Sequence, residues 1–177
     1  MATQSAQSEP RVIVTHPNRD KPVVQSTRAV VVLLLLVTAG LIGLITGAGW
    51  EVLQSATPVE IGYILVYLLL AFLAARWNRG ALPVAAALAV FLLIFAAVAA
   101  SGWFEREKTG YAEPALDSNV LGLLTLLIIP LQLLLIFFAI RGLQQGWNVE
   151  VERRADEGAE PARSSPEYVR TIPRGSG

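Results

Sequence analysis

The sequence predicts an all-α membrane protein: a bundle of four transmembrane helices with both termini in the cytoplasm and disordered tails. Of its 177 residues, 54% are hydrophobic and only 16% are charged, and the apolar residues gather in long stretches. At 1.5 Å per residue, about 20 residues cross the ~30 Å hydrocarbon core of a bilayer. We expect a membrane domain at 28–147 between tails 1–27 and 148–177, with spans at about 28–49, 58–77, 81–102 and 119–141.

The first apolar stretch is too long for the hydrophobic region of a signal peptide, which has about 7–15 residues. We therefore expect a retained helix, capped by Ser26 or Thr27. Ala39, Gly43 and Gly47 follow at four-residue spacing, so they share one helix face and form a groove that lets a second backbone approach closely. The sequence leaves open whether that groove packs within the chain or against a partner.

The second span opens on a capping-box pattern, with Thr57 at the N-cap, Pro58 at the first helical position and Glu60 three residues after the cap. This pattern predicts a structural role for Glu60. Tyr63 and Tyr67 lie on the same helix face as Glu60. Together they predict either a shallow pocket for a solute or quinone, or hydrogen bonds to a neighbouring helix near the interface.

A link of four residues, 77–80, joins the second and third spans, so these two helices should form an antiparallel hairpin. Gly80 is expected to take the left-handed conformation that ends many helices. The third span is rich in alanine, and it offers a surface that matches the small residues of the first span.

The fourth span, which Asp117 or Ser118 can cap, carries the sharpest local signal. Pro130 falls at its midpoint and predicts a kink, because it removes one backbone hydrogen bond. Gln132 follows near the bilayer centre, where an amide needs a hydrogen-bond partner on another helix or on the freed backbone. A kinked helix with a central amide suits either a gating element or a packing clamp.

The sequence excludes several kinds of chemistry. It has no cysteine, and its single histidine, His16, lies in the N-terminal tail. Disulfides, thiolate nucleophiles, iron–sulfur clusters, Cys-ligated zinc and a His-ligated haem are therefore not expected, and neither a catalytic residue, a metal, another cofactor nor a nucleic-acid partner is predicted. No ionisable residue lies in the middle of a span, although proton relays and ion pathways usually need one. The polar residues that remain within the spans are Thr38 and Thr46 of the first span and a candidate intramembrane polar set, which consists of Tyr63, Tyr67, Thr125 and Gln132.

Orientation follows from the positive residues. The two tails and the link between the second and third spans hold 12 of the 14 Lys and Arg residues, which places that side in the cytoplasm. The tails also contain three short β-like stretches, which could form a small sheet or add a strand to a partner, although isolated strands of this length are marginal. These stretches are Arg11 to Thr15, Asn148 to Glu152 and Tyr168 to Ile172. Tryptophans at the ends of the apolar stretches predict interfacial anchors at Trp50, Trp77, Trp103 and Trp147.

Two functions fit these features. The first is a non-catalytic accessory or scaffold component of an assembly in the cell membrane, in contact with the lipid bilayer and with other membrane proteins or a second copy of itself. The second is a small transporter, channel or lipophile-binding module that uses the intramembrane polar set. Convergence of that set on a cavity would favour the second function, and its dispersal into helix contacts would favour the first.

Overall fold

The computed structural model describes residues 12–15, 21–106, 114–147 and 151–154. The chain divides into two compact units, one formed by Met1–Thr15 with Glu150–Gly177 and one formed by His16–Val149. The first unit contains a strand pair and the second contains the helices, and each is described by itself.

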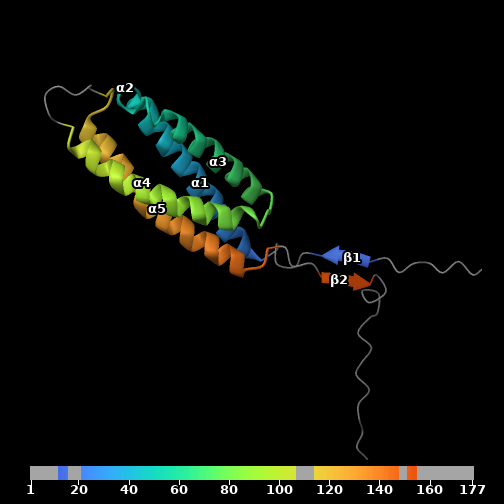
Figure 1. Ribbon diagram of the computed structural model, residues 1–177. Coiled ribbons are helices and arrows are strands. Elements are labelled where there is room, and N and C mark those ends of the chain that lie inside the picture. Colours follow the sequence, from blue (N-terminus) through green and yellow to red (C-terminus); the bar gives the residue numbers. More distant parts are fainter. Residues whose placement is uncertain (1–11, 16–20, 107–113, 148–150, 155–177) are drawn as a thin grey trace, which may run out of the picture. The chain divides into compact units, whose positions relative to one another are not determined.

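The helical unit contains four long helices and one short helical turn. The long helices are α1 (Pro22–Ala48), α3 (Thr57–Ala75), α4 (Ala81–Phe104) and α5 (Ser118–Gln144), and α2 (Trp50–Leu53) is the short turn between α1 and α3. Each long helix is long and apolar enough to cross a membrane (Figure 1). The predicted four-helix membrane bundle is therefore confirmed at this level, and the protein is a multi-pass membrane protein.

The helix ends differ from the predicted ones most at α1. This helix begins at Pro22, whose fixed φ suits a first turn, so Ser26 and Thr27 lie inside the helix and do not cap it. The Thr27 hydroxyl instead donates to the carbonyl oxygen of Val23, at 2.9 Å. At α5 the prediction holds, since the side chain of Asp117 accepts a hydrogen bond from the backbone N–H of Asn119.

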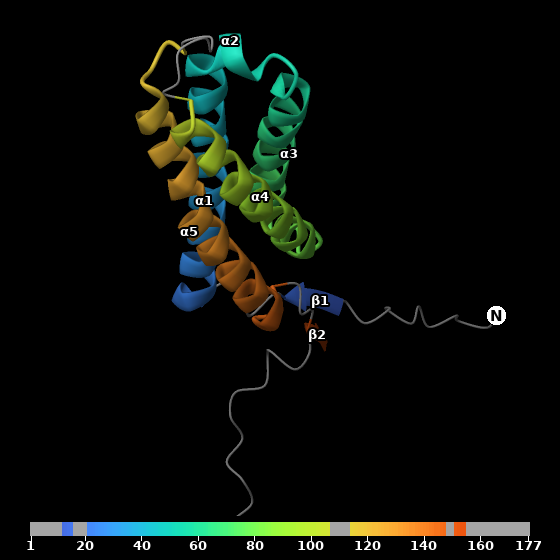
Figure 2. The same cartoon turned by 60° about the vertical axis from the view of Figure 1, so that its left-hand side comes forward.

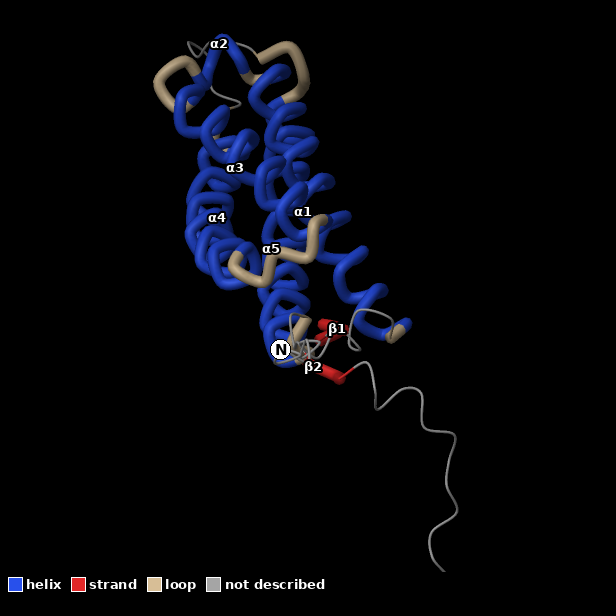
Figure 3. The backbone as a smooth tube through the Cα atoms, turned by 90° about the vertical axis from the view of Figure 1, so that its right-hand side faces the viewer, coloured by secondary structure: helices blue, strands red, loops and turns tan. Residues whose placement is uncertain are grey.

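The helices pack as two pairs. α4 lies against α5 along its length, and α1 contacts both α3 and α5. α3 and α4 are joined by a short link, yet they contact each other little, and Figure 2 shows them separating toward the end of the bundle where α2 lies. Figure 3 gives the course of the same helices from another side.

Small residues line the contact between α4 and α5. Lipid tails are as apolar as leucine side chains, so helices in a bilayer associate largely through close packing and hydrogen bonds. A row of buried alanines on α4 and small residues on α5 allow the two backbones to approach. These residues are Ala81, Ala85, Ala89, Ala96 and Ala100 on α4, and Gly122, Ala139 and Gly142 on α5.

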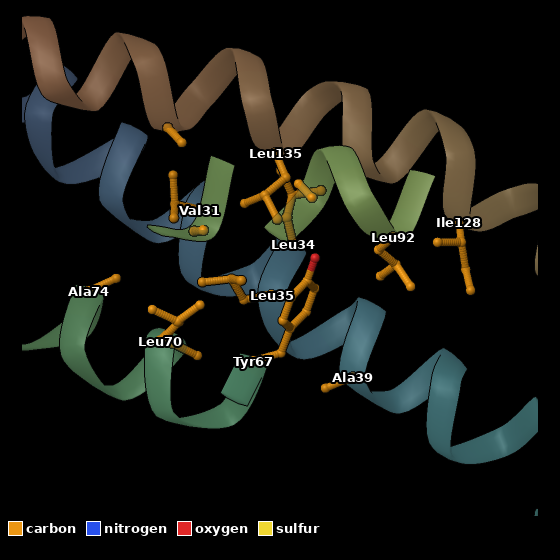
Figure 4. Close-up of a cluster of buried hydrophobic side chains, with 14 of the residues drawn as sticks. Val31, Leu34, Leu35, Ala39, Tyr67, Leu70, Ala74, Leu92, Ile128 and Leu135 are labelled. Atoms are coloured by element: carbon orange, nitrogen blue, oxygen red, sulfur yellow. The ribbon is translucent and has the colours of Figure 1, made fainter. Parts of the chain in front are cut away.

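The core of the bundle contains mainly branched aliphatic side chains and alanines, and one tyrosine is buried among them (Figure 4). Leu35 of α1, Tyr67 of α3 and Leu135 of α5 have no exposed surface. The outer faces are as apolar as the core, with Leu65 and Val98 more than half exposed. An apolar exterior on every helix is what contact with lipid requires.

The link between α3 and α4 corrects a second prediction. The residue in the left-handed region is Trp77, with φ 62°, whereas Gly80 has φ −63° and precedes α4. Left-handed φ is unfavourable for a side chain of this size. Contacts to the indole ring from α1 and from the end of α5, described below, hold it in place.

The strand unit corrects the prediction of disordered tails at eight residues. β1 (Val12–Thr15) pairs antiparallel with β2 (Val151–Arg154), and Val12 lies opposite Arg154 while Thr15 lies opposite Val151. Each strand satisfies the backbone groups that the other would leave open. The third β-like stretch, Tyr168 to Ile172, lies outside the described residues.

Candidate functional site

A hydrogen-bonded cluster joins three helices near their midpoints. Gln132 of α5 is fully buried, and its Oε1 accepts a hydrogen bond from the Tyr67 hydroxyl of α3 at 2.9 Å. Its Nε2 donates to Thr38 Oγ1 of α1 at 3.1 Å. Figure 4 shows Tyr67 reaching from α3 toward α5. We call Thr38, Tyr67 and Gln132 the midspan clamp.

Both the oxygen and the nitrogen of the Gln132 amide form hydrogen bonds within the protein. An amide in hydrocarbon is costly unless it is bonded, and here its partners come from two other helices. Pro130 lies two residues away on the exposed side of α5, and the helix continues through it. The predicted kink at Pro130 stays a prediction, but the amide beside it bonds other helices and not the freed backbone.

A cavity of about 650 Å³ occupies the half of the bundle nearer to α2. We call it the lateral cavity. All four long helices contribute to its walls, which are almost entirely apolar. Its deeper lining includes Ile42 and Ile45 of α1, Leu92, Ala96 and Trp103 of α4, and Ile128 of α5.

Three polar side chains reach the lateral cavity: Glu60, Tyr63 and Thr125. The Thr125 hydroxyl is already bonded to the carbonyl of Leu121 in its own helix, at 2.8 Å. Tyr63 packs edge-on against Tyr67, with ring centroids 5.9 Å apart. Of the predicted polar set, Tyr67 and Gln132 therefore belong to the clamp, while Tyr63 and Thr125 lie at the cavity.

Glu60 lies beside the hydroxyl of Thr46 on α1. Thr46 Oγ1 is 2.8 Å from Glu60 Oε2 and 2.7 Å from the carbonyl oxygen of Ile42. A threonine hydroxyl has one proton, so it can donate to only one of these two acceptors at a time. Within the described part of the chain, Thr46 is the one residue that hydrogen-bonds the Glu60 carboxyl group. The Ile42 carbonyl competes with Glu60 for that hydroxyl proton.

The predicted capping box at Thr57 and Glu60 does not form. The residue before α3 is Ala56, in a helical conformation and without a side-chain cap, because the turns that follow α2 continue almost directly into α3. The Thr57 hydroxyl donates back to the carbonyl of Leu53 at 2.9 Å, and Ala56 O accepts from the backbone N–H of Glu60 at 3.1 Å. With no cap to make, the Glu60 side chain turns toward α1.

The fold buries one part of the predicted small-residue face of α1 and leaves the rest exposed. Ala39 is buried in the bundle, whereas Gly43 and Gly47 are exposed. A Cβ added at Gly47 would meet nothing within 4 Å, and one added at Gly43 would meet only Ile64 Cδ1, at 3.8 Å. Within this chain the two glycines therefore leave an open strip of backbone, which Gly40 extends.

An aromatic cluster closes the opposite end of the bundle. The Arg28 guanidinium donates to the carbonyl of Ala75 at 2.9 Å and lies 4.2 Å from the centre of the Trp77 ring. Trp77 in turn meets Trp147 edge-on, with centroids 5.7 Å apart. These contacts tie the start of α1 to the ends of α3 and α5.

The four tryptophans differ in their exposure, and their predicted role as interfacial anchors stays a prediction. Trp147 is fully buried, and Trp103 is 4% exposed against the end of α1. Trp50 is 51% exposed, and Trp77 is partly exposed. The buried rings of Trp103, near the end of α4, and Trp147, in the turn after α5, pack between helices of the bundle.

Sequence reasoning recognised Thr38 and Thr46 as polar residues of the first span, but it missed that they bond Gln132 and Glu60, and it missed the contacts of Arg28. The two threonines share the buried stripe of α1 with Val31, Leu35 and Ile42, so helical periodicity could have placed them in the core. Among the described residues, no group of three His, Cys, Asp or Glu side chains is placed to hold a metal ion. Searches of family models, curated proteins and solved structures found no match to this chain.

Proposed function

We propose that this protein is a non-catalytic structural component of an assembly in the cell membrane, with both termini in the cytoplasm. The observation that carries the proposal is the midspan clamp. Gln132 is the polar group best placed for a transport pathway, and it is fully buried and bonded to two neighbouring helices. A group that is used to fix three helices together is not available to a passing solute.

The half of the bundle beyond the clamp supports the same conclusion. Leu35, Leu70, Ala74 and Leu135 are buried there around the clamp, so close-packed apolar side chains fill the space that a pathway would need. The alternative function as a transporter or channel also loses two of its four proposed groups to the clamp. Of that alternative, only the lipophile-binding module keeps support, and this support comes from the lateral cavity.

The open strip of α1 is the surface through which we propose that the assembly forms. Gly40, Gly43 and Gly47 leave backbone exposed along a helix that faces lipid, and small residues of this kind permit close helix approach. The positive residues of the tails support the proposed orientation.

A flux measurement tests the non-transporting part of the proposal. Purified protein reconstituted in liposomes should leave the leak of protons, potassium and small neutral solutes at the level of protein-free liposomes. The Gln132→Leu variant should behave in the same way. A flux that wild type supports and Gln132→Leu abolishes would contradict the proposal and make the clamp part of a pathway.

A further inference from the structure

We propose that the lateral cavity binds one amphiphile drawn from the bilayer, with an apolar tail and a head group that donates hydrogen bonds, preferably an amine. This binding goes beyond a structural role and does not depend on it. The inference combines three observations: where the cavity opens, how its walls are made, and which polar groups lie in it.

The cavity opens sideways, toward lipid. Its rim includes Val59 of α3 and Phe95 and Val98 of α4, which are 58%, 53% and 70% exposed. These helices separate from each other on the side of the bundle where α2 lies (Figure 2). A molecule already dissolved in the bilayer can therefore enter between α3 and α4 without crossing water.

The walls suit an apolar chain. Ile45, Leu92, Ala96 and Ile128 line the interior, and a volume of about 650 Å³ falls within the roughly 300–1,000 Å³ of small-molecule sites. Gln132 does not line the cavity, so a molecule can bind there without contact to the buried amide of the clamp.

The polar groups define the head. Glu60 is half-buried in a membrane helix, and its bonded neighbour, Thr46, also lies within reach of the Ile42 carbonyl. The Tyr63 hydroxyl makes no hydrogen bond to any residue that the structure describes. A carboxylate accepts several hydrogen bonds, and a carboxylate in a span normally needs a partner charge. An ammonium group supplies both, a hydroxyl supplies the hydrogen bond alone, and a carboxylate head would be repelled.

The test uses protein in lipid nanodiscs titrated with dodecylamine, dodecanol or dodecanoate, and native mass spectrometry counts the molecules bound. Wild type should bind one dodecylamine saturably and at least about tenfold more tightly than dodecanoate, a difference equal to about 1.4 kcal/mol. Glu60→Gln, which keeps the shape of the side chain, should lose this preference. Glu51→Gln, at an exposed acid outside the cavity, should retain it.

A second pair of variants separates the cavity from the outer surface. Ala99→Phe fills the lateral cavity from α4 and should abolish saturable binding of dodecylamine. Ala97→Phe adds the same ring to an exposed position of the same helix outside the cavity lining and should bind as wild type does. Equal binding by the two variants, equal affinity for dodecylamine and dodecanoate, or no saturable binding by wild type would each overturn the proposal.

Discussion

At the scale of single residues, Gln132 shows what a sequence can and cannot predict. A glutamine at the middle of a span must find a partner, and that requirement was visible from its position alone. The identity of the partners was not, because Tyr67 and Thr38 come from helices 65 and 94 residues away along the chain. Which face of each helix turns inward decides such a contact, and no local pattern fixes that choice.

The clamp predicts a measurable coupling between Tyr67 and Gln132. A double-mutant cycle with Tyr67→Phe and Gln132→Leu should give a coupling free energy of about 0.6 kcal/mol, and up to about 1.7 kcal/mol, since such bonds in membrane bundles have this strength. Unfolding by sodium dodecyl sulfate in mixed micelles measures it.

The matched control replaces Gln132→Leu with Thr125→Val. Thr125 lies on the same helix but bonds its own backbone, so its coupling to Tyr67 should be close to zero. Equal coupling in the two cycles would show that Tyr67 senses the packing of α5 in general and makes no specific bond to Gln132.

At the scale of helices, the apolar stretches made the elements predictable. Apolar stretches of about span length gave the number of helices and their approximate positions. The turns between helices were harder to predict, because a pattern of residue types does not show the backbone conformation of the residues before a helix. Thr57 and Glu60 match a capping box, but the helical backbone that follows α2 leaves no place for a cap. The β-like stretches of the two tails indicated where a small sheet could form, but not which stretches pair, because the strands lie at opposite ends of the chain.

The end of α1 provides a test at this scale. A Cβ at Gly49 would lie 2.8 Å from the Trp103 ring and 2.9 Å from the backbone oxygen of Ile45, and that oxygen cannot move aside easily. Gly49→Ala should therefore destabilise the bundle by roughly 1–3 kcal/mol, as overpacking usually does.

Gly47→Ala is the matched control, two residues earlier in α1, where an added Cβ meets open space. It should be neutral or stabilising by up to about 1 kcal/mol, because alanine is the better helix former. Unfolding in mixed micelles compares the two variants, and an equal loss of stability in both would contradict the close approach of Trp103 to Gly49.

At the scale of the whole molecule, we predict that both termini lie on one side of the membrane, because the number of candidate spans is even and Val12–Thr15 pairs with Val151–Arg154. The distribution of positive residues predicts that this side is the cytoplasm. The chain has no cysteine, so single cysteines can be introduced at Ala2, Thr109 and Ser176. A membrane-impermeant thiol reagent should label intact cells only at position 109. Labelling at position 2 or 176 would reverse the orientation.

We propose that the bundle is a structural unit that joins an assembly through the open strip of α1. The direct measurement is the size of the complex that contains the chain after extraction in mild detergent, for wild type, Gly43→Leu and Gly62→Leu. An added Cβ would meet nothing within 4 Å at Gly62 of α3 and only Ile64 Cδ1, at 3.8 Å, at Gly43 of α1, so we expect both variants to fold. Wild type and Gly62→Leu should migrate as the larger assembly and Gly43→Leu as the single chain. An identical size for all three proteins would contradict the claim.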